Sequence, residues 1–150
     1  MAINVRNVGH VVLKVRDIER AARFYRDVLG LKEVARANFG RPMAFFSTGE
    51  NHHDIAVLEV GPDAPLPQAG GVGLYHVALV IGTTLDELRA AKAHLEAHGY
   101  TTLRLTDHKV TQSIYLDDPD GNGVELYVNA DPAIWREDPS RVATVGPLTL

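Results

Sequence analysis

Two histidines in this sequence are placed so that they could share one chemical task. The position numbers of His10 and His76 differ by 66. Those of two glutamates, Glu59 and Glu125, differ by the same 66, so the offset from histidine to glutamate is 49 in each half. Imidazole and carboxylate groups bind Fe(II), Mn(II), Zn(II) and Ni(II). Two histidines with one carboxylate also leave coordination positions open for substrate and dioxygen, so the spacing indicates a metal site.

The residues around these side chains alternate as they do in β-strands. The aliphatic residues on both sides of His76 share one strand face, and His76 lies on the other. The same alternation separates His10 and Glu125 from the aliphatic faces of their own strands. Residues 118–123, Asp-Pro-Asp-Gly-Asn-Gly, predict a tight turn that aims the strand of Glu125. We therefore expect a metal site made of His10, His76 and Glu125.

Each half of the sequence also contains one amphipathic helix after its first strand. Asp17 is the expected N-cap of the first helix, and Gly30 its end. Thr84 is the expected N-cap of the second helix, with Glu87 completing a capping box and Gly99 ending the helix. The apolar residues between these boundaries recur at helical spacing.

The order strand, helix, strand, strand, strand therefore occurs twice. We predict the α+β class, with two βαβββ modules in tandem. The domain is expected to comprise module one at about 5–61, a Pro- and Gly-rich linker at 62–72, module two at about 73–130 and an ordered tail at 131–150 anchored by Trp135. The expected strands lie near 7–15, 31–35, 43–47, 53–60, 74–81, 101–105, 112–116 and 123–128.

Composition narrows the function classes. The 150 residues include no cysteine, which excludes disulfides, thiolate metal sites and a cysteine nucleophile. The formal net charge of −4 gives no basic surface for nucleic acid. No apolar run approaches the ~18 residues that cross a membrane, and no leader opens the chain. We expect one soluble, cytoplasmic domain with no nucleic-acid or membrane partner.

The duplicated pattern, His10 and His76, and the ending from Asp118 to Glu125 resemble the vicinal oxygen chelate superfamily. This superfamily includes glyoxalase I, methylmalonyl-CoA epimerase, fosfomycin- and bleomycin-resistance proteins, and type I extradiol dioxygenases. The resemblance covers about residues 5–130. It implies that the two modules form a half-open mixed β-sheet barrel around a metal pocket, with the helices outside. Because the fold hosts several reactions, the site has to identify the chemistry.

Three further residues resemble the active site of extradiol (catechol 2,3-) dioxygenases. His53, in His-His-Asp-Ile-Ala, matches the histidine that acts as acid and base beside the bound catechol. Tyr115, ten residues before Glu125, matches the tyrosine that hydrogen-bonds the substrate oxygen. His108 resembles a further histidine near the substrate. The resemblance implies an Fe(II) enzyme that uses O2 to open the ring of a catechol-type aromatic to a semialdehyde, with Mn(II), Ni(II) and Zn(II) as the other metals this site would accept.

Glu59 supports a different reaction. The matching residue of glyoxalase I is a fourth metal ligand, whereas extradiol enzymes normally have no ligand at this position. If Glu59 bound the metal, a glyoxalase-I-like lyase or isomerase acting on a carbonyl substrate would be the better interpretation.

Two other expectations rest on analogy. Bleomycin-resistance proteins sequester a drug between subunits without metal, and a non-catalytic small-molecule binding protein is therefore a third hypothesis. Many extradiol enzymes contain two double modules and this chain contains one, so we expect a homodimer that helps to close the pocket.

Overall fold

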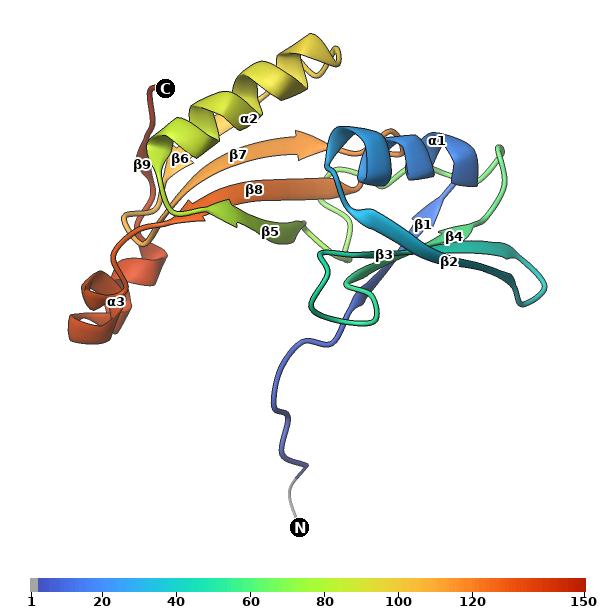
Figure 1. Ribbon diagram of the computed structural model, residues 1–150, viewed down its shortest axis with the longest axis horizontal. Coiled ribbons are helices and arrows are strands. Elements are labelled where there is room, and N and C mark those ends of the chain that lie inside the picture. Colours follow the sequence, from blue (N-terminus) through green and yellow to red (C-terminus); the bar gives the residue numbers. More distant parts are fainter. Residues whose placement is uncertain (1–2) are drawn as a thin grey trace. The chain divides into compact units, whose positions relative to one another are not determined.

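The computed structural model describes residues 3–150, which divide between Leu66 and Pro67 into two units (Figure 1). The division falls in the segment 62–72 that the sequence marks as a linker. Each unit contains a mixed sheet with its principal helix packed on one face. The predicted α+β class with two βαβββ-type modules is therefore confirmed. No helix within 3–150 has the length and apolar character that crossing a membrane would require.

The first unit contains four strands in the order β1-β4-β3-β2. Strand β1 pairs with β4 in parallel, and the other two pairs are antiparallel. Its core is formed by one face of this sheet and the helical segment, and includes Leu13, Ala21, Phe46, Ile55 and Val57. The elements are β1 (Val11–Val15), α1 (Ile18–Ala22), η1 (Arg23–Val28), β2 (Lys32–Asn38), β3 (Pro42–Ser47) and β4 (Ile55–Glu59).

The predicted first helix is helical throughout but changes type. Asp17 caps it as expected, because its Oδ1 accepts from the Arg20 N–H at 2.9 Å. After Ala22 the chain continues as a π-helix, in which the Leu29 N–H donates to the Phe24 carbonyl oxygen at 2.9 Å. A π-helical turn contains more residues than an α-helical turn, so neighbouring side chains diverge less. Phe24 and Tyr25 are adjacent in sequence, and both are fully buried.

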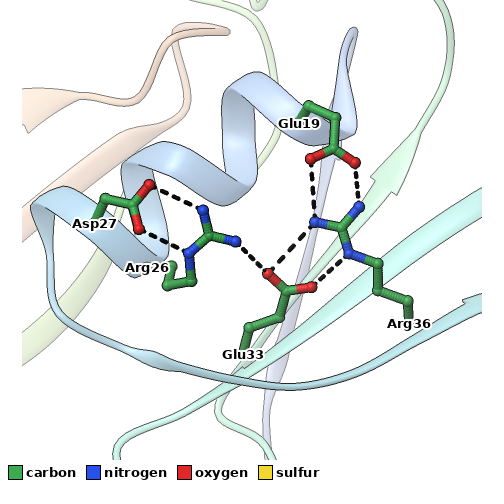
Figure 2. A network of polar contacts seen from close by, with 5 residues as sticks. All are labelled: Glu19, Arg26, Asp27, Glu33 and Arg36. Atoms are coloured by element: carbon green, nitrogen blue, oxygen red, sulfur yellow. Dashed lines mark hydrogen bonds and ion pairs between the residues drawn. The ribbon is translucent and has the colours of Figure 1, made fainter.

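A network of five charged side chains joins this helical segment to β2 (Figure 2). Arg36 binds Glu19 and Glu33, and Arg26 binds Glu33 and Asp27. The hydrogen bond from Arg36 lowers the pKa of Glu33, and the one from Arg26 lowers it further. Such pairs stabilise weakly at a surface, and Glu33, with 17% side-chain exposure, is the most buried member.

The second unit contains five strands in the order β5-β8-β7-β6-β9, with β5 and β8 parallel. Helix α2 begins with the predicted capping box between Thr84 and Glu87 and buries Leu88 and Leu95. The elements are β5 (Val77–Gly82), α2 (Leu85–Ala97), β6 (Arg104–Asp107), β7 (Thr111–Asp117), β8 (Gly123–Asn129), α3 (Ala133–Glu137), η2 (Pro139–Ala143) and β9 (Gly146–Pro147).

The tail after β8 is ordered, but Trp135, the residue expected to anchor it, is exposed. Its side chain is 44% exposed and contacts the guanidinium of Arg136. The tail is attached instead by backbone pairing, because β9 adds to the edge of β6. A large aromatic residue in a polar tail is therefore a poor predictor of where the tail is fixed.

Candidate functional site

Four predicted site residues of the second unit form a chain of polar contacts. His76 Nε2 lies 3.0 Å from Glu125 Oε2. The Tyr115 hydroxyl donates to the other carboxylate oxygen of Glu125, Oε1, at 2.8 Å. His108 Nε2 lies 2.8 Å from the same hydroxyl, and His108 Nδ1 lies 2.8 Å from the carbonyl oxygen of Thr144.

The strands account for this arrangement. Tyr115 in β7 is the direct antiparallel partner of Glu125 in β8, so both side chains lie on one face of the sheet. His76 immediately precedes β5, which is parallel to β8 and begins opposite Val124. His108 follows β6 in the turn that leads into β7. Glu125 is only 7% exposed, which would be costly for a carboxylate without these partners.

The contacts of His108 constrain its protons. A carbonyl oxygen can only accept, so the contact with Thr144 requires a proton on Nδ1. In a neutral ring Nε2 then accepts from Tyr115, and the single hydroxyl proton cannot also bond Glu125. Burial and the neighbouring Glu125 raise the pKa of Tyr115 to about 12, so its hydroxyl keeps its proton at neutral pH.

The donor atoms of His76 and Glu125 suit a shared metal ion. Two ligand atoms at neighbouring octahedral positions, each about 2.1 Å from the ion, lie about 3 Å apart. The observed separation of Nε2 and Oε2 is 3.0 Å. Metal binding at Nε2 would place the proton on Nδ1. This buried atom has no hydrogen-bond partner within residues 3–150, so these residues do not supply the acceptor that usually orients a metal-binding histidine. Among these residues there is no group of three His, Asp or Glu side chains that could hold a metal ion.

The remaining predicted ligand, His10, lies in the first unit beside two other histidines. Its ring centroid is 4.3 Å from that of His53 and 6.5 Å from that of His52. His52 Nδ1 and His53 Nδ1 are 2.7 Å apart, and Phe45 contacts the His53 ring edge-on. Burial lowers the pKa of His53, and the charges on His10 and His52 lower it further. His53 is therefore a neutral imidazole at pH 7, able to accept a proton.

Glu59 has a structural contact in the first unit. Its Oε2 accepts from the Ile18 N–H at 2.9 Å, at the first residue of α1. An acceptor at this position satisfies an N–H group that the helix leaves unpaired, and its charge suits the helix dipole. Glu59 and Asp17 thus cap the same helix end. This contact favours the three-ligand set over a set that includes Glu59.

The strand register shows that Glu59 is not the counterpart of Glu125. In the second unit, Glu125 of β8 is paired with Ala78 of β5. The offset of 66 makes Val12 of β1 the counterpart of Ala78. Val12 is paired with Ala56 of β4. Ala56 therefore occupies the position that matches Glu125. Its antiparallel neighbour Phe45 likewise matches Tyr115. Glu59 lies three residues further along β4, on the opposite face, where α1 packs.

A cavity of about 280 Å³ opens beside His76 and Tyr115 within the second unit. It is lined from the loop before β5 and the ends of β6, β7 and β8. Arg104 and Asp117 contribute the other charged side chains of its lining. The Arg104 guanidinium carbon lies 4.0 Å from the centroid of the Tyr115 ring.

Sequence reasoning missed Arg104 and Asp117. A signal for Arg104 exists, because the hairpin turn after Asp107 sets the register of β6 against β7. Counting back from the turn places Arg104 opposite Tyr115 and therefore on the face of the site.

A family model described as "Glyoxalase/Bleomycin resistance protein/Dioxygenase superfamily" matches residues 7–126. The chain is 32% identical over 133 residues to the catechol-2,3-dioxygenase of Bacillus subtilis, a match that covers 88% of this chain and 45% of that protein. It is 30% identical over 137 residues to the iron-dependent extradiol dioxygenase of Rhodococcus jostii, covering 79% of this chain and 42% of that protein.

The chain thus spans less than half the length of either relative. Among solved structures, a glyoxylase/bleomycin resistance protein/dioxygenase domain from Frankia sp. superimposes with a TM-score of 0.73 at 21% identity. That match covers 86% of this chain and 96% of the other. At this identity the similarity concerns the fold alone.

Proposed function

Because this chain belongs to the glyoxalase/bleomycin resistance protein/dioxygenase family, the vicinal oxygen chelate superfamily, we propose that it is an Fe(II)-dependent extradiol dioxygenase. Its substrates are a catechol-type aromatic and O2, and its product is a ring-opened semialdehyde. The observation that carries the proposal is the chain of contacts from His76 through Glu125 and Tyr115 to His108. The two relatives whose names specify extradiol or catechol dioxygenases add support.

The metal would be held by His10, His76 and Glu125. When bound, Fe(II) supplies a positive charge that lowers the pKa of catechol oxygens and the redox chemistry that dioxygen requires. Both atoms of O2 enter the product, so the reaction needs no further reductant. Relatives named for glyoxalase and dioxygenase chemistry share this family, so the donor set and not the fold supports the choice of reaction.

The protein's own residues would move and hold the protons. His53, neutral at pH 7, accepts a phenolic proton from the catechol and returns it during ring opening. Tyr115 keeps its hydroxyl proton and donates it to the Glu125 carboxylate when no substrate is bound; with the catechol in place it would turn this one proton to the substrate oxygen. His108 holds the Tyr115 hydroxyl in place and is itself fixed by the Thr144 carbonyl.

The glyoxalase-like alternative requires Glu59 as a fourth ligand. In that case its carboxylate would have to bind the metal through Oε1, or release the Ile18 N–H that Oε2 accepts from. The three-ligand proposal leaves this helix cap in place. We further propose a homodimer in the cytoplasm, which sedimentation at working concentration would test: a monomer mass would contradict it.

The proposed reaction is tested by anaerobic reconstitution with Fe(II), followed by a panel of catechols and then O2. We expect a yellow ring-fission product near neutral pH. Loading with Ni(II) or Zn(II) and adding a thiohemiacetal provides the matched comparison. Turnover of the thiohemiacetal with no ring fission would replace the proposal by lyase or isomerase chemistry. Stoichiometric binding of a drug without metal or turnover would replace it by sequestration.

A further inference from the structure

Arg104 is a charged residue of the second unit that the proposed reaction does not use. It lies at the first position of β6, opposite Tyr115, and lines the cavity that His76 and Tyr115 also line. Within residues 3–150 its guanidinium makes no hydrogen bond or ion pair, and its contact is with the Tyr115 ring. Arg26 and Arg36 of the first unit, by contrast, each bind two carboxylates.

Stacking on an aromatic ring leaves the hydrogen-bonding capacity of an arginine available. The guanidinium carbon lies over the Tyr115 ring, and none of the group's five N–H donors is used in a hydrogen bond or ion pair within residues 3–150. The ring also restricts the side chain, so less rotamer freedom is lost when an anion binds. An arginine held in this way suits bidentate recognition of a carboxylate.

We propose that this cavity selects an aromatic substrate that carries a carboxylate side chain, with Arg104 binding the carboxylate. The inference rests on the proposed function, because it places the catechol ring beside Tyr115 and His76. A volume of about 280 Å³ lies at the small end of ligand pockets and suits a single ring with a short substituent. Because a cavity of this size suits one ring, Arg104 would recognise the substrate by the negative charge of its short substituent.

A second charged residue of the cavity, Asp117, would give the opposite charge preference for the substrate's side chain. It lies two residues after Tyr115 in β7, on the same strand face, and also lines the cavity. If Asp117 rather than Arg104 determined the charge preference, the cavity would favour a cationic substituent. Two catechols with short side chains of opposite charge, 3,4-dihydroxyphenylacetate and dopamine, separate these cases, and 4-methylcatechol is the neutral reference.

Binding is measured anaerobically by calorimetry on the Fe(II)-loaded full chain, so that no turnover occurs. We expect 3,4-dihydroxyphenylacetate to bind about 10-fold more tightly than 4-methylcatechol, as one charge-assisted pair at a partly exposed site would give. Arg104→Gln should abolish this ratio, and Arg104→Lys should retain part of it. Asp117→Asn, the matched charge control, should preserve or increase it. Equal affinities in the wild type, or tighter binding of dopamine, would overturn the proposal.

A second measurement separates this inference from the proposed reaction. Phenylacetate, which has no catechol oxygens, is titrated into the metal-free protein while the Arg104 side-chain signals are followed by NMR, with circular dichroism to confirm that the variants fold. Arg104-dependent binding without ring fission of any catechol would reject the dioxygenase and support the carboxylate subsite. Ring fission without a preference for acidic catechols, and without phenylacetate binding, would support the dioxygenase and reject the subsite.

Discussion

The two units share one chain order but place different chemistry at matching positions. In the second unit, the buried Glu125 and its half-buried neighbour Tyr115 form a polar pair. In the first unit, the matching pair is Ala56 and Phe45, and the polar groups nearby are imidazoles. The repeated order of elements therefore gives two matching sheet faces, of which one carries a carboxylate and the other does not. The comparison also explains Glu59, which supports a helix because it lies on the other face of its strand.

Removal of Glu125 tests the comparison most severely. We expect Glu125→Ala to lose stoichiometric metal and to slow ring cleavage by at least ~10³-fold, because the remaining ligands are both imidazoles. Metal analysis of the purified protein after Fe(II) loading measures the first effect. His76→Ala should give the same result. Full metal occupancy in either variant would remove these residues from the ligand set.

His53 in the first unit should matter for rate and not for metal. We expect His53→Ala to keep its Fe(II) and to lose about 10²- to 10³-fold in rate, the range that general acid–base catalysis supplies. Below the lowered pKa of His53 the wild type should also lose activity, because the protonated ring cannot accept a phenolic proton. A rate profile against pH that is the same in the wild type and in His53→Gln would contradict this role.

Tyr115→Phe converts one position of the second unit into its first-unit counterpart, Phe45. The substitution removes the hydroxyl that joins Glu125 to His108 while it preserves the ring under Arg104. We expect metal to be retained and the rate to fall by about 10- to 100-fold, as for other groups that orient a metal ligand. Single-turnover kinetics with a saturating catechol measures the change. An unaltered rate would make the hydroxyl a structural group only.

Glu59→Ala should leave the metal bound and act on stability. Loss of the contact with the Ile18 N–H should lower the free energy of unfolding by about 1 kcal/mol, as loss of a helix cap does. Urea unfolding monitored by circular dichroism measures the difference, and Thr84→Ala in the second unit is a matched cap deletion. If Glu59→Ala lost its metal, the four-ligand alternative would be correct.

The smallest effect is expected from Glu33 in the surface network. Its pKa is lowered in the folded state, so its ion pairs stabilise the protein above the unfolded value near 4.5. This contribution is lost as the pH falls through the lower, folded-state pKa. Glu33→Gln should therefore lower stability by less than about 1 kcal/mol at pH 7 and have no effect at strongly acidic pH. A difference that grew on acidification would have the wrong sign.

Local signals in the sequence predicted the fold well. Asp17 and Thr84 were identified as helix caps from the residues around them, and both make the expected bonds. The change to a π-helix after Ala22 could not be predicted, because it depends on the burial of Phe24 and Tyr25 against the sheet. The strand boundaries also differ by a few residues: β5 begins at Val77, after His76, and not at position 74.

The repeat arithmetic failed where loop lengths differ. Position numbers differ by 66 between His10 and His76 and by 67 between Asp17 and Thr84. The difference is 70 between Phe45 and Tyr115 and 69 between Ala56 and Glu125. The offset between matching positions therefore rises from 66 to 70 and then falls to 69, and only strand pairing reveals these changes in loop length. The sequence could predict that Tyr115 forms a hydrogen bond near Glu125, because ten residues and one turn separate them. The contact of Arg104 could not be predicted in this way, because it depends on the register of β6 against β7.

The bond between His108 and Thr144 has a practical consequence. The acceptor is a main-chain carbonyl, so every amino acid at position 144 would still provide it. Point mutations there are expected to be silent, whereas a shift of the tail by one residue would withdraw the carbonyl from His108. Random substitution libraries would therefore overlook this link, and short insertions or deletions between Asn129 and Gly146 would expose it.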